Sequence, residues 1–166
     1  MSISVTNSLS LRIFYNNYAS VAKGATRNSA TKGTLSFADS SAMRNAIRKL
    51  QDYNFEESSD EQVQEKLKAF ADTINNTLES AGKYASGSSA VRHAVSNIKN
   101  LNSQYADELK KIGITVEKDG NLSVYDSAGK NYSKEKFDKF FNKDSEYLNS
   151  LYDAAKKITR RVDVRI

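Results

Sequence analysis

Two stripes of apolar residues at helical spacing form the clearest pattern in the chain, over residues 60–112. The apolar positions recur at steps of three and four, as they do on one face of a helix. Gly82 and the Ser/Gly-rich residues 86–89 separate the stripes, and glycine readily adopts the left-handed conformation that ends helices. We predict two long helices, over about 60–85 and 89–112, that form an antiparallel helical hairpin. Its seam comprises Val63, Leu67, Phe70, Ile74 and Leu78, followed by Val91, Val95, Ile98, Tyr105, Leu109 and Ile112.

Helix starts can be placed from residues that accept hydrogen bonds from the first backbone N–H groups of a helix. Ser58 with Glu61 has the spacing of a capping box at the start of the first long helix. Asp39, Ser40 or Ser41 precedes a further apolar stripe and predicts a helix over about 40–53. Because each helix of the hairpin has the other to bury its apolar face against, the seam is more often core than a partner site.

The period changes from helical to alternating after residue 112. Ile114 and Val116 alternate with polar residues, Asp119-Gly120 forms a turn, and Leu122 and Val124 alternate again. This pattern predicts a β-hairpin near 114–125. Further apolar stripes predict a helix after Ser133, ending in aromatic residues, and a last helix from Ser145 or Glu146. The expected fold is mainly α with a small β-hairpin, as a single helical domain over 39–166.

Residues 1–38 differ from the rest because Ser, Thr and Asn dominate, and Gly24 and Gly33 interrupt any long helical period. We expect a flexible, basic N-terminal arm. Within it, Leu11, Phe14, Tyr15 and Tyr18 recur at helical spacing and are candidates for partner binding. A helical turn that folds back on the protein's own core explains the same four residues equally well.

Composition removes several classes of chemistry from the 166-residue chain. It has no Cys, Pro or Trp and a single His, His93, so disulfides, thiolate catalysis, Cys-based zinc sites and paired-His mechanisms are excluded. The turn at Asp119 lacks the spacing of a calcium-binding EF-hand loop, and no phosphate-binding or nucleophile motif is present. We expect no enzymatic activity, no cofactor, no metal and no small-molecule substrate.

Positive charge is concentrated at the beginning of the chain. The net charge is +5, and residues 1–50 hold seven Lys or Arg against one acidic residue, Asp39. Such an arm could contact nucleic acid, although dispersed charges are more typical of a solvated segment. No apolar run is long enough to span a bilayer, and the first residues lack the pattern of a secretory signal peptide.

The helix-to-hairpin junction resembles a known family. The residues 109–114 (LKKIGI), 119–124 (DGNLSV), Asp126 and the aromatic pair 140–141 follow the order found in the C-terminal helical domain of the flagellar filament-capping protein, hook-associated protein 2. Residues 67–78 look like that family's preceding helix. The resemblance covers roughly residues 60–145, and its junction residues are Ile112, Gly113, Ile114, Gly120, Leu122 and Val124.

The resemblance implies a non-enzymatic structural or assembly protein, exported or at the cell surface as part of the bacterial flagellum. Its partners would be flagellin-like subunits or further copies of itself. Two other readings remain open. One is a cytoplasmic helical adaptor or chaperone that binds a partner helix in a groove beside the hairpin, which exposed apolar area there would favour. The other, less favoured, is nucleic-acid binding through the basic arm.

Overall fold

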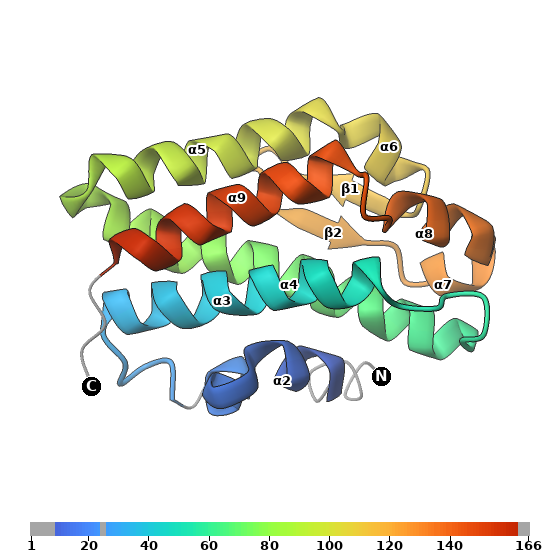
Figure 1. The fold of residues 1–166 in the computed structure, drawn as a ribbon, viewed down its shortest axis with the longest axis horizontal. Helices are drawn as coiled ribbons and strands as arrows, with labels where there is room; N and C mark the ends of the chain where they lie inside the picture. Colours follow the sequence, from blue (N-terminus) through green and yellow to red (C-terminus); the bar gives the residue numbers. More distant parts are fainter. Residues whose placement is uncertain (1–8, 24–25, 163–166) are drawn as a thin grey trace.

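The computed structural model describes residues 9–23 and 26–162 and confirms the predicted fold class. Four long helices pack side by side, each antiparallel to its neighbours in the ring, as in an up-and-down bundle (Figure 1). A short helix and a 3₁₀ segment lie along this bundle, and a two-stranded sheet packs against one of its helices. The long helices are α3 (Lys32–Gln51), α4 (Asp60–Tyr84), α5 (Ser89–Gln104) and α9 (Glu146–Arg161).

The helical hairpin is present, but its two helices are not each other's main partners. α4 and α5 are joined by the 3₁₀ turn η2 (Ala85–Gly87) and run antiparallel. α4 packs most extensively against α3, whereas α5 packs most extensively against α9. The prediction that the two helices of the hairpin bury their apolar faces mainly against each other was therefore wrong. The apolar faces of four helices share one core. The second predicted helix also breaks at Tyr105, where α6 (Ala106–Lys110) begins.

α3 begins eight residues before the predicted position. Thr31 caps it, because the Thr31 hydroxyl accepts a hydrogen bond of 3.1 Å from the Thr34 N–H. The expected capping residues Asp39 and Ser40 lie inside the helix and are wholly buried. The predicted domain boundary after residue 38 thus falls within α3, because these buried polar residues resemble a helix start in the sequence.

The capping residues of α4 and α9 can be compared with the predicted ones. At α4 the capping box is formed by Ser59 and Gln62, not by Ser58 and Glu61 as predicted. Ser58 is buried instead and bonds to the Tyr53 hydroxyl and the Asn54 carbonyl. At α9 the predicted start is confirmed, because the Ser145 hydroxyl accepts a hydrogen bond from the Leu148 N–H.

The predicted β-hairpin is also confirmed. β1 (Ile114–Val116) pairs antiparallel with β2 (Leu122–Val124), with Ile114 opposite Val124. Gly113 and Gly120 adopt positive φ angles of 85° and 90°, which side-chain-bearing residues rarely adopt. After the hairpin come α7 (Ala128–Asn131) and α8 (Lys134–Phe140), which lead into α9.

Two amides fasten the hairpin to the bundle. The Asn75 side chain on α4 donates to the Leu122 carbonyl and accepts from the Leu122 N–H, both at 2.8 Å. The buried Asn102 side chain on α5 donates to the Gly120 carbonyl at 2.8 Å and accepts from the Tyr147 hydroxyl at 2.7 Å. The hairpin is therefore held at both its turn and its second strand.

Among residues 9–23 and 26–162, no helix combines the length and the apolar character needed to cross a bilayer.

Candidate interaction site

The N-terminal segment packs on the bundle, which differs from the expected flexible arm over its described residues. Its elements are α2 (Leu9–Tyr15) and the 3₁₀ segment η1 (Asn16–Lys23), which lie beside α3 and α4. Leu11, Phe14 and Tyr15 are buried in the core, and the half-buried Tyr18 meets Phe37 edge-on with ring centroids 5.9 Å apart. The four residues predicted to bind a partner therefore pack inward. Residues 1–8 and 24–25 of the expected arm lie outside the described residues.

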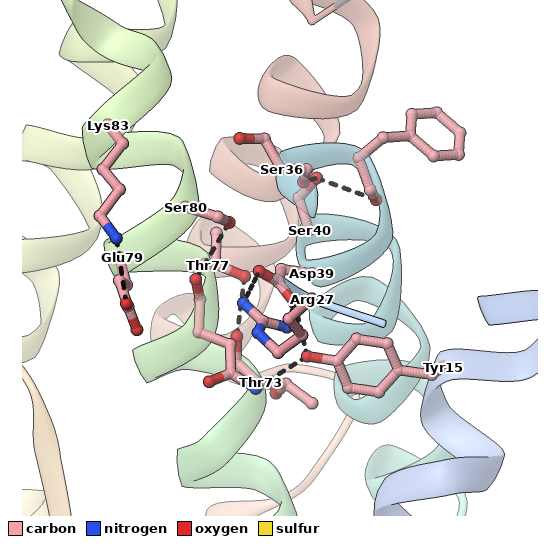
Figure 2. Close-up of polar contacts among 12 residues, drawn as sticks. Tyr15, Arg27, Ser36, Asp39, Ser40, Thr73, Thr77, Glu79, Ser80 and Lys83 are labelled. Atoms are coloured by element: carbon pink, nitrogen blue, oxygen red, sulfur yellow. Dashed lines mark hydrogen bonds and ion pairs between the residues drawn. The ribbon is translucent and has the colours of Figure 1, made fainter. Parts of the chain in front are cut away.

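A buried polar cluster joins this segment to the bundle (Figure 2). Asp39 on α3 is wholly buried, and its two carboxylate oxygens accept hydrogen bonds of 2.8 Å from the two terminal nitrogens of Arg27. The Tyr15 hydroxyl donates to the same carboxylate at 2.6 Å and accepts from the Asn76 amide on α4 at 2.9 Å. We call these four residues the Asp39 cluster. It ties α2, the turn at 26–30, α3 and α4 together.

The protonation states of Tyr15 and Arg27 allow the cluster to hold its segments together near neutral pH. Burial, together with the adjacent Asp39 charge, raises the pKa of Tyr15 well above its usual range, so Tyr15 stays a neutral donor. The hydrogen bonds to Asp39 hold the pKa of Arg27 above its ordinary value, so Arg27 stays charged. Neither group changes protonation near neutral pH, and the cluster is suited to holding segments together.

An open groove of about 390 Å³ lies on the outer side of α2, where the N-terminal segment meets α3. We call it the α2 groove. Leu9 and Ile13, one helical turn apart, are 57% and 45% exposed, although both are large apolar residues. Its lining contains no Asp or Glu. The lining residues that matter below are Leu9, Arg12, Ile13, Asn16, Asn45 and Lys49.

Hydrogen bonds between side chains and the backbone hold α2 in place beside the groove. The Asn45 side chain on α3 donates a hydrogen bond of 2.9 Å to the Phe14 carbonyl near the end of α2. Asn16, directly after α2, adopts a positive φ of 55°, a conformation that asparagine tolerates better than most residues. The Ser10 N–H at the other end of α2 donates to the Glu65 carboxylate at 2.9 Å. α2 is thus fixed at both ends.

The seam and junction residues lie almost entirely inside the molecule. All the predicted seam residues are buried except Tyr105, which is half-buried at the break between α5 and α6. Five of the six junction residues are buried and Val124 is half-buried. Gly113 is needed for space as well as for conformation, because a Cβ there would lie 2.6 Å from the Ala128 Cβ. These residues build the fold and do not form a surface.

The described residues include no group of three or more His, Cys, Asp or Glu side chains that could hold a metal ion. His93 is exposed on α5, as expected. Besides Leu9 and Ile13, the large apolar residue exposed on the described surface is Tyr125, which directly follows β2 and is 54% exposed.

Sequence reasoning missed the Asp39 cluster and the α2 groove. One signal was present for the cluster, because Asp39 is the only acidic residue among the first fifty and seven cations surround it in sequence. Its partner Arg27 cannot be identified from spacing, because the two residues are twelve positions apart and only the fold brings them together. The groove was missed because its apolar residues, Leu9 and Ile13, are not part of the predicted helical stripe that begins at Leu11.

No protein-family model matches the chain, and comparisons with curated proteins and with solved structures return no match.

Proposed function

We propose that this chain is a non-enzymatic structural or assembly protein that acts by packing against other proteins, in the manner of the flagellar cap components that its junction resembles. The proposal places it in an exported, flagellum-associated setting, with flagellin-like subunits as partners. The observation that carries it is the unit formed by α5, α6, β1, β2 and α8. This unit contains the junction residues of the resemblance, and hydrogen bonds from Asn75 and Asn102 attach its hairpin to the bundle.

Tyr125 gives this unit a contact residue. Its N–H donates to the Gly113 carbonyl at 2.8 Å, and its carbonyl accepts from the Gln64 side chain at 3.0 Å, so the backbone that carries the exposed ring is fixed. Tyrosine is enriched among the residues that dominate binding energy, and a side chain carried on a fixed backbone loses less entropy on binding than one on a mobile loop. Tyr125 is therefore the side chain of the hairpin best suited to anchor a partner.

The internal use of buried polar groups also supports a packing role. The Asp39 carboxylate and the Asn102 amide are wholly buried, and each is paired with side chains of this chain. Both groups hold elements together, which is the chemistry a rigid assembly unit needs.

The test is binding of the purified full chain to purified flagellin and hook-junction proteins from flagellated cells, measured by fluorescence anisotropy. We expect binding that Tyr125→Ser weakens roughly tenfold, as for a central aromatic contact. Ile13→Ser is the matched control, because it removes an exposed apolar residue from α2 instead of the hairpin. Absence of binding to these proteins, or equal loss in both variants, would contradict the proposal.

The two other readings gain less support. The buried seam leaves no exposed apolar stripe along the hairpin helices for an adaptor groove there. Of the basic residues in the first fifty, Arg27 is paired with Asp39, while Arg44 and Arg48 contact the Tyr152 ring and bond to α9. These engaged cations are not available to phosphates without breaking internal contacts.

A further inference from the structure

We propose that the α2 groove binds a helix of a partner protein that carries two apolar side chains one turn apart, flanked by carboxylates. This surface is separate from the hairpin, and the inference does not rest on the proposed flagellar role.

The apolar part of the argument comes from Leu9 and Ile13. Both project from α2 on the side away from the buried Leu11 and Phe14, and both remain about half exposed in an otherwise well-covered protein. Their spacing of four residues places them one above the other along the helix. A second helix laid into the groove would cover both with residues spaced by three or four, which is how amphipathic helices are recognised.

The positive charges of the groove favour acidic residues on the partner helix. Arg12 and Lys49 line it, no acidic residue does, and neither cation forms an ion pair within residues 9–23 and 26–162. Among the described residues, the buried Nε–H of Arg12 also has no hydrogen-bond acceptor. Glu65 on α4 contacts the start of α2, where its carboxylate already accepts a hydrogen bond from the Ser10 N–H. Carboxylates on the partner would complement this uncompensated positive charge.

The groove is preformed, which limits the entropic cost of binding. Asn45 holds the end of α2 on α3, and Glu65 holds its beginning. The exposed apolar area nevertheless comes from two side chains, far less than the roughly 800 Å² per partner of stable complexes. The expected complex is accordingly weak and reversible, and its affinity should fall as salt screens the Arg12 and Lys49 charges.

The test uses a helical alanine-based peptide of about 20 residues, with Leu at two positions four apart and Glu beside them. Anisotropy titration against the full chain measures its affinity, and amide chemical shifts in NMR spectra locate it. A second peptide has Lys in place of Glu. We expect the Glu peptide to bind at α2 and the start of η1, and the Lys peptide to bind at least tenfold more weakly.

Matched variants separate the apolar and the charged contributions. Ile13→Ser should weaken the Glu peptide roughly tenfold, whereas Tyr125→Ser, an equally exposed site on the hairpin, should leave it unchanged. Lys49→Glu should narrow or reverse the preference between the two peptides, whereas the same charge change at the exposed Lys118 should not. All four substituted positions are exposed, so the variants should keep the fold, which an unchanged NMR spectrum elsewhere verifies.

Three results would overturn the inference. The first is equal binding of the two peptides, and the second is shifts that map outside the groove. The third is concentration-dependent shift of groove amides without peptide, which would assign the groove to a second copy of this chain. Flagellin binding through Tyr125 is read in a separate assay, so the two proposals can fail independently.

Discussion

At the scale of single residues, the two members of the Arg27–Asp39 ion pair differ in how deeply they are buried. Asp39 is wholly buried, while the Arg27 side chain is 20% exposed. Removing the arginine leaves a carboxylate that water cannot reach, whereas removing the carboxylate leaves a cation that can partly rehydrate. The two partners are therefore unequal, even though they form one ion pair.

We expect Arg27→Met to lower the free energy of unfolding by about 3 kcal/mol or more, and Asp39→Asn to lower it by less. Urea denaturation followed by circular dichroism measures both. Lys83→Met is the matched control, because its ion pair with Glu79 is exposed and should contribute no more than about 0.5 kcal/mol. Equal losses in Arg27→Met and Lys83→Met would show that the cluster does not clamp the segment.

Asp72 predicts how stability depends on pH. Burial raises its pKa to about 6, only partly offset by Lys68. A carboxyl group whose pKa is higher in the folded state binds more protons when folded, so its contribution lowers stability as the pH rises from about 4 to 6. Asp72→Asn should raise the free energy of unfolding at pH 7 by on the order of 1 kcal/mol, after discounting for partial exposure. Denaturation at pH 4 should show little gain, and a loss at pH 7 would contradict the assignment.

At the scale of elements, Asn102 couples α5, the hairpin and α9 through one side chain. Asn102→Ala leaves the Tyr147 hydroxyl and the Gly120 carbonyl without a partner, so it should cost about 2 kcal/mol. Tyr147→Phe alone should also destabilise the protein. The double variant should lose less than the two single losses combined, because the Tyr147 hydroxyl is then no longer orphaned. Additive losses in thermal unfolding would exclude this coupling.

Two glycines offer a test of opposite signs. Gly113 has a positive φ and faces Ala128, so Gly113→Ala should destabilise the protein by about 2 kcal/mol. Gly82 lies within α4 with open space around it, so Gly82→Ala should stabilise the protein by about 0.5 kcal/mol through helix propensity. Chemical denaturation of both variants distinguishes the two roles, and stabilisation by Gly113→Ala would contradict the junction geometry.

The elements also show what the sequence could reveal. The starts of α4 and α9 and the position of the hairpin follow from the apolar period and the turn residues, because these signals involve only a few neighbouring residues. The start of α3 was missed because Asp39 and Ser40 look like capping residues in the sequence, although tertiary contacts bury them. The partners of Asp39 could not be predicted, because Tyr15 on α2 and Arg27 in the turn at 26–30 meet it only once the N-terminal segment has packed on the bundle.

At the scale of the whole molecule, the N-terminal segment packs as an additional layer on α3 and α4. We expect hydrogen exchange to show the amides of α2 from Leu11 to Tyr15 protected to a degree similar to those of α3, because both lie in one core. Rapid exchange throughout α2 in the isolated protein, with protection gained on adding flagellin, would instead restore the expected flexible arm.

The position of Asp39 has a consequence for fragments of this chain. Any fragment that begins after Arg27 keeps the buried carboxylate but loses the two side chains of the N-terminal segment that satisfy it. The bundle helices alone would then enclose an uncompensated charge, and they would open so that water could hydrate it. One acidic side chain in α3 thus makes the native state of the helices depend on Tyr15 and Arg27 being in place.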